Sequence, residues 1–401
     1  MTDYLIIGNG VAANSAAETI RHLDQKGSIR MFTREEFPFY YTPALPEYIS
    51  EEKALKNIFI HDLPWYEKNR ITLHRGTEVL GIDLSGKTVI TEGGRRFHYD
   101  RLLLATGAAC QVPSIAGTNT DGVFTLRTIA DADAIIERAK KAKKAVLIGG
   151  GLLGLEAGNG LRKRGLRVSV VEFFPRLLPR QMDFPGAAIL QKQMEAMGFS
   201  FHLGAATREI VRTGSVLSVH LETGERLDAD MVLISAGIRP ETTLARSIGA
   251  EIGKGVKVDD TMKAGIEDVY AAGDLIEHRG SVYGIWPAAT EQGRVAGSNM
   301  AGKKKAYKGT LPANKLKVAG VNLFAAGDID HEGKRTSIVR KDETSYIYRK
   351  LVLRDHSLIG AILLGDLRGS DEIHNVIGTG MDISAFGADM ADGSFDFSKI
   401  K

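Results

Sequence analysis

Tyr4-Leu5-Ile6-Ile7-Gly8-Asn9-Gly10-Val11-Ala12-Ala13 is the stretch of sequence that decides the fold. Its first four residues are mainly apolar and run directly into a glycine-rich turn. Apolar residues then recur at positions 13, 16, 17, 20 and 23, the spacing of one face of an α-helix that continues until Gly27. A second apolar run follows at Ile29–Phe32. The pattern predicts a β-strand, a tight turn, a helix and a parallel β-strand.

The same pattern occurs a second time. Ala145–Ile148 is apolar, residues 149–154 read Gly-Gly-Gly-Leu-Leu-Gly, and a predicted helix runs to about Arg164 before a strand at Arg167–Glu172. Both turns match G-x-G-x-x-G/A, whose glycines let the backbone approach a diphosphate while the following helix N-terminus favours its negative charge. Two such turns predict two dinucleotide-binding units. The candidate contacts are Gly8, Gly10, Val11, Ala12 and Ala13 in the first unit and Gly149, Gly151, Leu152, Leu153 and Gly154 in the second.

An acidic residue follows each turn at about the distance at which such units bind a ribose hydroxyl. Glu172 ends the predicted strand of the second unit. Its carboxylate would repel a 2′-phosphate, so NADH is favoured over NADPH, although Arg176 or Arg180 could reach a phosphate. In the first unit the strand is not followed at once by an acid, so we assign the ribose contact to Glu35, with Arg34 as the alternative neighbour.

Composition excludes several classes of function. The 401 residues are enough for two to four domains, and 43% hydrophobic with 25% charged residues is typical of a globular protein. A net charge of +3 does not favour binding to nucleic acid or a membrane surface, and no apolar stretch reaches the roughly 18 residues of a membrane span. The ten histidines lack metal-ligand spacing. The single cysteine, Cys110, cannot form an internal disulfide or an iron–sulfur site, so we expect a cytoplasmic protein whose redox chemistry lies in bound cofactors.

Two dinucleotide sites without a metal or thiol centre predict an oxidoreductase in which a tightly bound flavin exchanges electrons with a nicotinamide. Three further apolar runs end in small residues, as strands that bring backbone to a ligand do. Their candidate contacts are Ala105, Thr106, Gly107, Gly237, Gly273 and Asp274. From about residue 306 a separate α/β domain is predicted, with strand-like segments at Leu316–Phe324, Thr344–Leu353 and Leu358–Leu364. The tail after about residue 385 is expected to be loosely ordered.

Over about residues 1–370 the motifs resemble the flavin-dependent pyridine-nucleotide oxidoreductases of the glutathione-reductase fold. The matching motifs are Gly8–Ala13, Ala105–Gly107, Leu126–Thr128 with Asp131, Gly149–Glu156, Ala271–Asp274 and Ala289–Gly293. The resemblance implies an α/β fold with two Rossmann-like domains and a C-terminal α/β interface domain. It implies a discontinuous FAD domain over residues 1–113 and 238–305, an NAD domain over 114–237 and the interface domain over 306–401.

The same resemblance implies roles for single residues. Asp274 would hold the ribityl chain of FAD, Arg127 would line the FAD site, and a helix beginning near Ala289 and Thr290 would point its N-terminus at the flavin ring. Glu156 would lie near the place where the two rings meet, or hydrogen-bond FAD or cap its helix. No residue is assigned as catalytic, because hydride transfer needs the rings to be positioned and needs no acid or base.

Two sequence details indicate the branch of the family. Disulfide reductases carry a CxxxxC pair and peroxidases a single cysteine near residues 42–44, where this chain has Thr42, Pro43 and Ala44. Without a thiolate their mechanisms are not expected. Glu47 stands where many ferredoxin reductases have a lysine paired with the counterpart of Glu156. The chain is therefore most similar to rubredoxin reductases and the flavin portion of NADH-dependent nitrite reductases. Residues 37–43 resemble the aromatic turn that those proteins have before the flavin.

The expected function is a FAD-dependent NADH oxidoreductase that passes electrons between NAD(H) and an iron–sulfur electron carrier or partner subunit. An NADH oxidase using oxygen and a non-catalytic flavin-binding or redox-sensing subunit are the alternatives. The basic stretch from Lys303 to Lys317 is either a solvated linker or a docking surface for an acidic partner. A homo-oligomer is also possible. The repeat of Ala271–Asp274 at Ala325–Asp328 is predicted to be a surface turn.

Overall fold

A computed structural model describes residues 1–383, 386, 390, 395–396 and 399 of the chain. It divides into two compact units. The first unit contains residues 1–42, 55–109 and 238–310, and the second contains residues 43–54, 110–237 and 311–401. Among the described residues, no helix is long and apolar enough to cross a membrane. The predicted domain boundaries at residues 113, 237 and 305 remain predictions.

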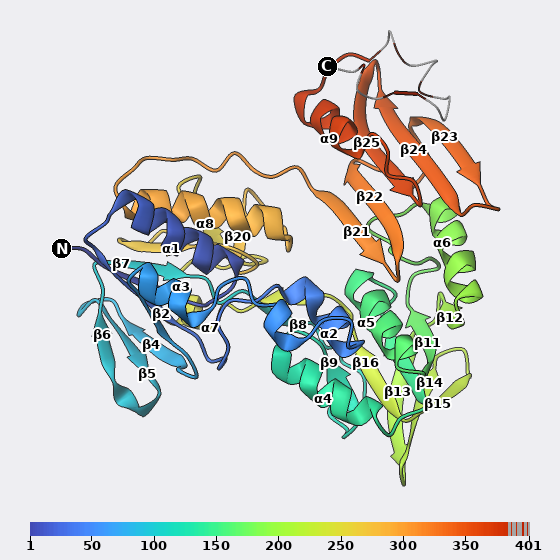
Figure 1. Cartoon of the computed structure of the whole chain (residues 1–401), viewed down its shortest axis with the longest axis horizontal. Helices are drawn as coiled ribbons and strands as arrows, with labels where there is room; N and C mark the ends of the chain where they lie inside the picture. Colours follow the sequence, from blue (N-terminus) through green and yellow to red (C-terminus); the bar gives the residue numbers. More distant parts are fainter. Residues whose placement is uncertain (384–385, 387–389, 391–394, 397–398, 400–401) are drawn as a thin grey trace. The chain divides into compact units, whose positions relative to one another are not determined.

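The first unit is built on a five-stranded parallel sheet (Figure 1). The strands lie in the order β19 (Val269–Ala271), β7 (Arg101–Leu104), β1 (Asp3–Ile7), β2 (Ser28–Phe32) and β3 (Ile71–His74). Its interior strands are nearly continuous apolar runs, as expected of a parallel sheet buried on both faces. The remaining elements are α3 (Leu63–Lys68), β4 (Val79–Asp83), β5 (Thr88–Thr91), β6 (Arg96–His98), β17 (Ile238–Pro240), α7 (Thr243–Ser247), β18 (Val256–Val258) and β20 (Ile276–His278).

Two helices of the first unit, α1 (Val11–Leu23) and α8 (Trp286–Met300), lie side by side (Figure 1). Their approach depends on glycine, because a Cβ atom at Gly293 would lie 2.3 Å from the carbonyl oxygen of Ala12. The prediction that the first helix would continue until Gly27 is wrong. The helix ends at Leu23 because Asp24 adopts an extended conformation and its carboxylate accepts hydrogen bonds from the following turn.

The second unit contains another five-stranded parallel sheet. Its order is β12 (Phe199–Leu203), β11 (Arg167–Glu172), β10 (Lys144–Ile148), β16 (Met231–Ile234) and β9 (Val123–Thr125). The helices of this region are α2 (Leu45–Ile49), α4 (Ile129–Ala139), α5 (Leu152–Lys163) and α6 (Phe184–Ala196), and β13 (Thr207–Thr213), β14 (Val216–Leu221) and β15 (Arg226–Ala229) form an antiparallel meander. The strand β8 (Ala108–Cys110) lies where the chain passes from one unit to the other.

The C-terminal part of the second unit is an antiparallel sheet followed by α9 (Ser370–Thr379). Its order is β21 (Ala313–Val318), β22 (Val321–Gly327), β25 (Ser357–Leu364), β24 (Ile347–Arg354) and β23 (Thr336–Asp342). The α/β class and both predicted strand–turn–helix units are confirmed.

Three predictions about the C-terminal sheet need correction. The predicted strand Leu316–Phe324 is a hairpin, because Ala319 and Gly320 turn the chain with φ of 50° and 92°. The strand predicted from Thr344 begins at Ile347, and β23 was missed because its polar, exposed residues carry little apolar signal. In the repeat Ala325–Asp328, the two alanines are buried in β22 and only Asp328 lies beyond the strand. The predicted loose tail lies largely outside the described residues.

Candidate functional site

The first glycine-rich turn joins β1 to α1 and excludes side chains at one position while leaving space at another. Gly8 has φ of 125°, and a Cβ atom there would lie 2.1 Å from the carbonyl oxygen of Ala105. A Cβ atom at Gly10 would meet nothing within 4 Å. Gly10 caps α1 without a side-chain hydrogen bond, so the N–H groups of its first turn can face a ligand. This combination of close backbone packing and open space fits a diphosphate.

A buried polar network that sequence reasoning missed fixes this turn. Asn14 Nδ2 donates hydrogen bonds to the carbonyl oxygens of Asn9 (2.9 Å) and Gly10 (3.0 Å). Tyr66 Oη, from α3, donates to Asn14 Oδ1 at 2.8 Å and itself accepts from the N–H of Phe39. Burial raises the pKa of Tyr66, so its hydroxyl stays protonated. The available sequence signal was Asn14 itself, a polar residue among the small apolar residues of α1.

Gly273 and Asp274, two further predicted contacts of the first unit, follow the end of β19. Gly273, with φ of 86°, donates its N–H to Oε1 of the buried Gln292 at 2.9 Å. A Cβ atom at Gly273 would lie 3.0 Å from Cβ of Ala12 and 3.9 Å from Cβ of Ala289. The structure therefore brings together the first glycine turn, the turn preceding Asp274, and the start of α8 with Ala289 and Thr290. Phe39 and Tyr41 contact Trp286 at the beginning of α8, with ring centroids 5.7 and 4.8 Å apart.

The polar candidates of the first unit occupy the loops after β2 and β7. Glu35 Oε2 accepts a hydrogen bond from Tyr40 Oη at 2.7 Å. Thr106 Oγ1 donates to the carbonyl oxygen of Glu241, whose N–H donates to the carbonyl oxygen of Gly107. The pKa of Glu241 is lowered, first by the hydrogen bond from the Thr243 side chain and further by nearby arginines that include Arg34. Glu241 is thus a charged neighbour that the sequence did not reveal.

The second glycine turn repeats the geometry of the first inside the second unit. Gly149 has φ of 116°, and a Cβ atom there would lie 2.2 Å from the carbonyl oxygen of Ser235. Gly151 again has nothing within 4 Å, and it caps α5 without a side-chain hydrogen bond. A Cβ atom at Gly154 would lie 2.6 Å from the carbonyl oxygen of Gly149, so this turn needs its third glycine. Gly237, with φ of 104°, follows β16 nearby in the sequence. This turn also fits a diphosphate.

Glu172 is held directly against the second turn. The residue is 6% exposed, its Oε2 accepts the N–H of Gly150 at 2.6 Å, and its Oε1 accepts the N–H of Phe174 at 2.8 Å. Arg176 is engaged in its own loop, with Nε donating to the carbonyl oxygen of Met182. Of the two arginines considered for a 2′-phosphate, Arg180 is exposed and Arg176 is committed to backbone contacts. A fixed carboxylate and an occupied arginine favour a ribose that carries no phosphate.

Glu156 faces the C-terminal sheet. From α5, its Oε1 accepts the N–H of Ala319 in the turn between β21 and β22 at 2.5 Å. Burial raises the pKa of Glu156 to about 7, and the negative charge of Glu47 adds to the increase. Glu47 is itself paired with Lys53. The structure thus gives Glu156 a role that the sequence did not suggest, which is a contact with the C-terminal sheet.

The remaining candidates are Arg127, Thr42 and Pro43. The backbone N–H of Arg127 donates to the carboxylate of Asp131 at the start of α4. Thr42 is partly exposed and Pro43 is exposed. The Cys110 thiol contacts the carbonyl oxygen of Leu126, and burial raises the pKa of that thiol. A partly buried thiol with a raised pKa is a poor nucleophile, which agrees with a structural role for Cys110.

Comparison with known proteins identifies the family. Residues 2–293 match the profile described as "Pyridine nucleotide-disulphide oxidoreductase", and residues 312–381 match "Rubredoxin NAD+ reductase C-terminal domain". The chain therefore belongs to the pyridine nucleotide-disulphide oxidoreductase family, an enzyme family whose cofactors are FAD and NADH. The predicted resemblance, including its rubredoxin-reductase branch, is confirmed.

Three relatives illustrate the similarity. "Nitrite reductase [NAD(P)H]" of Bacillus subtilis is 37% identical over 95% of this chain and 48% of its own length. "NADH-rubredoxin oxidoreductase" of Clostridium acetobutylicum is 29% identical over 91% of this chain and 92% of its own. The crystal structure of the Clostridium enzyme superposes with a TM-score of 0.82, 27% identity, and coverage of 97% of this chain and 98% of that one. The chain thus spans about half the length of the Bacillus relative and nearly all of the Clostridium one.

Proposed function

We propose that this chain is a FAD-dependent NADH oxidoreductase that passes electrons between NAD(H) and an iron–sulfur electron carrier or a partner subunit. The observation that carries the proposal is the pair of equivalent turns, in which Gly8 and Gly149 each pack against a strand-end carbonyl while Gly10 and Gly151 stay open. One turn lies in each unit, so one chain offers two places for a dinucleotide diphosphate.

The first unit would hold FAD and the second would hold NADH. When bound, the flavin accepts a hydride from NADH and can pass its electrons on singly. The residues of the chain bind and orient: the glycine turns receive the diphosphates, Glu172 accepts a ribose hydroxyl, and the start of α8 places a helix N-terminus toward the flavin. We assign contacts with FAD to Arg34 or Glu35, Thr42, Pro43, Arg127 and Asp274 as well.

A protein acceptor is favoured over a disulfide substrate. Cys110 is the only cysteine of the sequence, and partial burial raises the pKa of its thiol. The chain therefore offers no thiolate for exchange with a disulfide. The name of the Clostridium relative includes rubredoxin, and we propose that this chain exchanges electrons with a carrier of that class. Because the chain matches only 48% of the length of the Bacillus relative, a further region or partner subunit is the second candidate.

The lysine-rich stretch gives this proposal a testable surface. Lys305 is paired with Glu291 and Lys315 with Asp371, whereas Lys303, Lys304 and Lys308 are exposed. An acidic carrier would be attracted to such lysines, and the attraction would weaken as salt increases. If the stretch is only a solvated linker, replacing these lysines would leave the rate of carrier reduction unchanged. Cytoplasmic location and homo-oligomerisation remain predictions.

The proposal is tested by mixing the purified protein with NADH, and separately with NADPH, under anaerobic conditions while flavin absorbance is followed. We expect a yellow protein that NADH bleaches much faster than NADPH. The reduced protein is then mixed with rubredoxin, and in a parallel sample with oxygen. Rapid oxidation by oxygen alone would favour an NADH oxidase. A bound flavin that neither nucleotide reduces would contradict the proposal and favour a non-catalytic flavin-binding subunit.

A further inference from the structure

The loop that follows Glu172 forms the outer side of the second glycine turn. This loop, residues 173–183, connects β11 to α6. Within it Leu178 has φ of 47°, is fully buried, and donates its N–H to the carbonyl oxygen of Gly150 at 3.1 Å. A Cβ atom at Gly150 would lie 3.0 Å from the side chain of Leu177. The conformation of the loop therefore determines the shape of the turn that would receive NADH.

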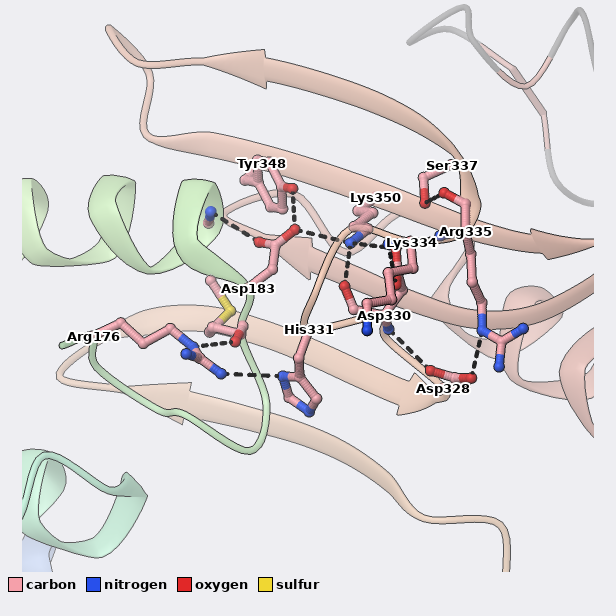
Figure 2. Close-up of polar contacts among 12 residues, drawn as sticks. Arg176, Asp183, Asp328, Asp330, His331, Lys334, Arg335, Ser337, Tyr348 and Lys350 are labelled. Carbon is pink, nitrogen blue, oxygen red and sulfur yellow. Dashed lines mark hydrogen bonds and ion pairs between the residues drawn. The ribbon is translucent and has the colours of Figure 1, made fainter. Parts of the chain in front are cut away.

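The far end of the loop is held by a buried network from the C-terminal sheet (Figure 2). Asp183 caps α6, with Oδ1 accepting the N–H of Gly186 at 3.1 Å. Its other oxygen, Oδ2, accepts from Tyr348 Oη at 2.7 Å and lies 3.1 Å from Lys350 Nζ. Tyr348 and Lys350 belong to β24, and all three residues in this contact are 5% exposed or less.

Lys350 also connects the loop to a second segment of the C-terminal sheet. Its Nζ donates to the carbonyl oxygen of Asp330 at 2.8 Å and lies 3.5 Å from Asp330 Oδ2. The Asp330 carboxylate accepts the N–H groups of Lys334 and Arg335, which closes the connection between β22 and β23. Figure 2 shows Lys350 between Asp183 and Asp330, so a single buried ammonium group joins two parts of the second unit.

The middle of the loop has a further contact with the same segment. Arg176 Nη2 donates to the carbonyl oxygen of Pro179 at 3.1 Å. Figure 2 shows the same guanidinium group beside His331, whose Nδ1 lies 3.4 Å from Nη2. The ring of Tyr348 packs so closely on the first turn of α6 that a Cβ atom at Gly186 would lie 2.8 Å from it. The ion pair between Asp183 and Lys350 is buried. A buried ion pair contributes little net stability compared with apolar packing, and its better-attested use is to fix one geometry.

We propose that Asp183, Tyr348 and Lys350 are positioning residues through which the C-terminal sheet sets the affinity of the second turn for NADH. They do not touch the nucleotide site themselves, since they act through the loop and its contact between Leu178 and Gly150. The inference rests on the proposed function, because the loop matters to the reaction only where the second turn binds NADH. It adds that the C-terminal sheet is part of the nucleotide-binding machinery as well as a region for a partner.

The test uses two mild variants of the full-length flavoprotein. Tyr348→Phe removes one hydrogen bond and keeps the ring on Gly186, and Asp183→Asn keeps a capping side chain while removing the ion pair with Lys350. We expect each to weaken NADH binding by about 3- to 10-fold, measured as a dissociation constant. KM for NADH should rise to match, with kcat and flavin content unchanged. The double variant should lose less than the product of the two single effects, because both changes disrupt one network.

Hydrogen–deuterium exchange across residues 173–183 supplies a readout that does not depend on turnover. We expect faster exchange in both variants and none of these changes in the matched control Tyr346→Phe, which alters a tyrosine outside the network. Lys350→Met should also weaken NADH binding, because it removes the positive charge. Lys350→Arg keeps the charge and should retain most of the wild-type affinity. Unchanged NADH affinity in the variants, with or without faster exchange, would overturn the inference, and so would weaker affinity without faster exchange. A wild-type protein that does not bind NADH would instead overturn the proposed function.

Discussion

The two glycine turns share one backbone solution but differ in how they are held. A Cβ atom at Gly8 would lie 2.1 Å from the carbonyl oxygen of Ala105, and one at Gly149 would lie 2.2 Å from that of Ser235. Gly10 and Gly151 both face open space. The first turn is fixed by uncharged side chains of its own unit, Asn14 and Tyr66. The second is fixed by the charged carboxylate of Glu172 and by a loop anchored on the C-terminal sheet.

This difference agrees with different tasks for the two sites. A cofactor that stays bound needs a turn held by contacts that do not change, and a neutral network buried in one unit provides them. A nucleotide that enters and leaves on every turnover needs selectivity, and a carboxylate beside a loop held in one geometry provides it. The comparison implies that damage to one turn should leave the other working.

The largest expected effects come from adding a single methyl group to each turn. Gly8→Ala would force a Cβ atom against Ala105 at a φ that alanine rarely adopts, so we expect loss of bound flavin and destabilisation by more than about 3 kcal/mol. Gly149→Ala should retain flavin but weaken NADH binding by at least about 100-fold. Flavin absorbance, thermal unfolding and NADH titration measure the three quantities.

Gly378→Ala is the matched control, because Gly378 lies in helix α9 with nothing within 4 Å of a Cβ atom. It should leave flavin content and NADH affinity unchanged and slightly stabilise the helix. If Gly8→Ala and Gly149→Ala both lost flavin and NADH together, the two turns would not be independent and the comparison would be wrong.

Glu172 should account for the nucleotide selectivity of the second turn. We expect Glu172→Gln to weaken NADH binding by about 10-fold, because a hydrogen-bond acceptor for the ribose loses its charge. Binding of NADPH should weaken less or improve, since the repulsion of its phosphate is removed. Dissociation constants for both nucleotides check this, with the exposed Glu222→Gln as control. An unchanged preference would mean that selectivity lies elsewhere, for example at Arg180.

The parts of the site that depend on backbone pattern could be predicted from sequence, and the parts that depend on long-range side-chain contacts could not. Gly8 and Gly149 stand in a local pattern of strand, glycine and helix that the sequence states directly. Tyr66 lies 52 residues from Asn14, and Lys350 reaches back to Asp183 across 167 residues, so nothing local marks either partner. The C-terminal hairpin at Ala319 and Gly320 was missed for another reason, since one glycine inside a strand-like run can mark a bulge as well as a turn.

Glu156 gives the helix after the second glycine turn a group that titrates near neutral pH, and the equivalent position after the first turn has none. The corresponding position of α1 is Ser15, which has no charge to titrate. Burial raises the pKa of Glu156 from 4.5 to about 7 in the folded protein, so between these values the folded state binds a proton that the unfolded chain has released. Stability therefore falls as the pH rises through this window. Relative to Glu156→Gln, which stays neutral, the wild type should lose about 1–3 kcal/mol between about pH 5 and pH 8.

The pH effect is measured as the difference in unfolding free energy between wild type and Glu156→Gln across the series. Glu47→Gln is an informative companion, because removing the nearby negative charge should lower the pKa of Glu156 and shift the window toward lower pH. A difference between wild type and variant that stays constant with pH would show that Glu156 is ionised throughout, and the contact with Ala319 would then be a hydrogen bond to a carboxylate.

A further substitution, at Tyr66, tests whether the first turn is held by its neutral network. Tyr66→Phe removes the hydroxyl that donates to Asn14 and leaves the ring in place, so we expect a loss of about 1–3 kcal/mol, because a buried acceptor loses its partner. The loss should appear in thermal unfolding and as faster release of flavin, with NADH affinity unaffected. Tyr99→Phe, which removes the hydroxyl of a buried tyrosine of the same unit outside this network, is the control for flavin release. Flavin release is the more specific readout, because the network bonds to the backbone of the turn itself. A variant that lost stability but released flavin at the wild-type rate would show that Asn14 and Tyr66 support the fold of the first unit without shaping its turn.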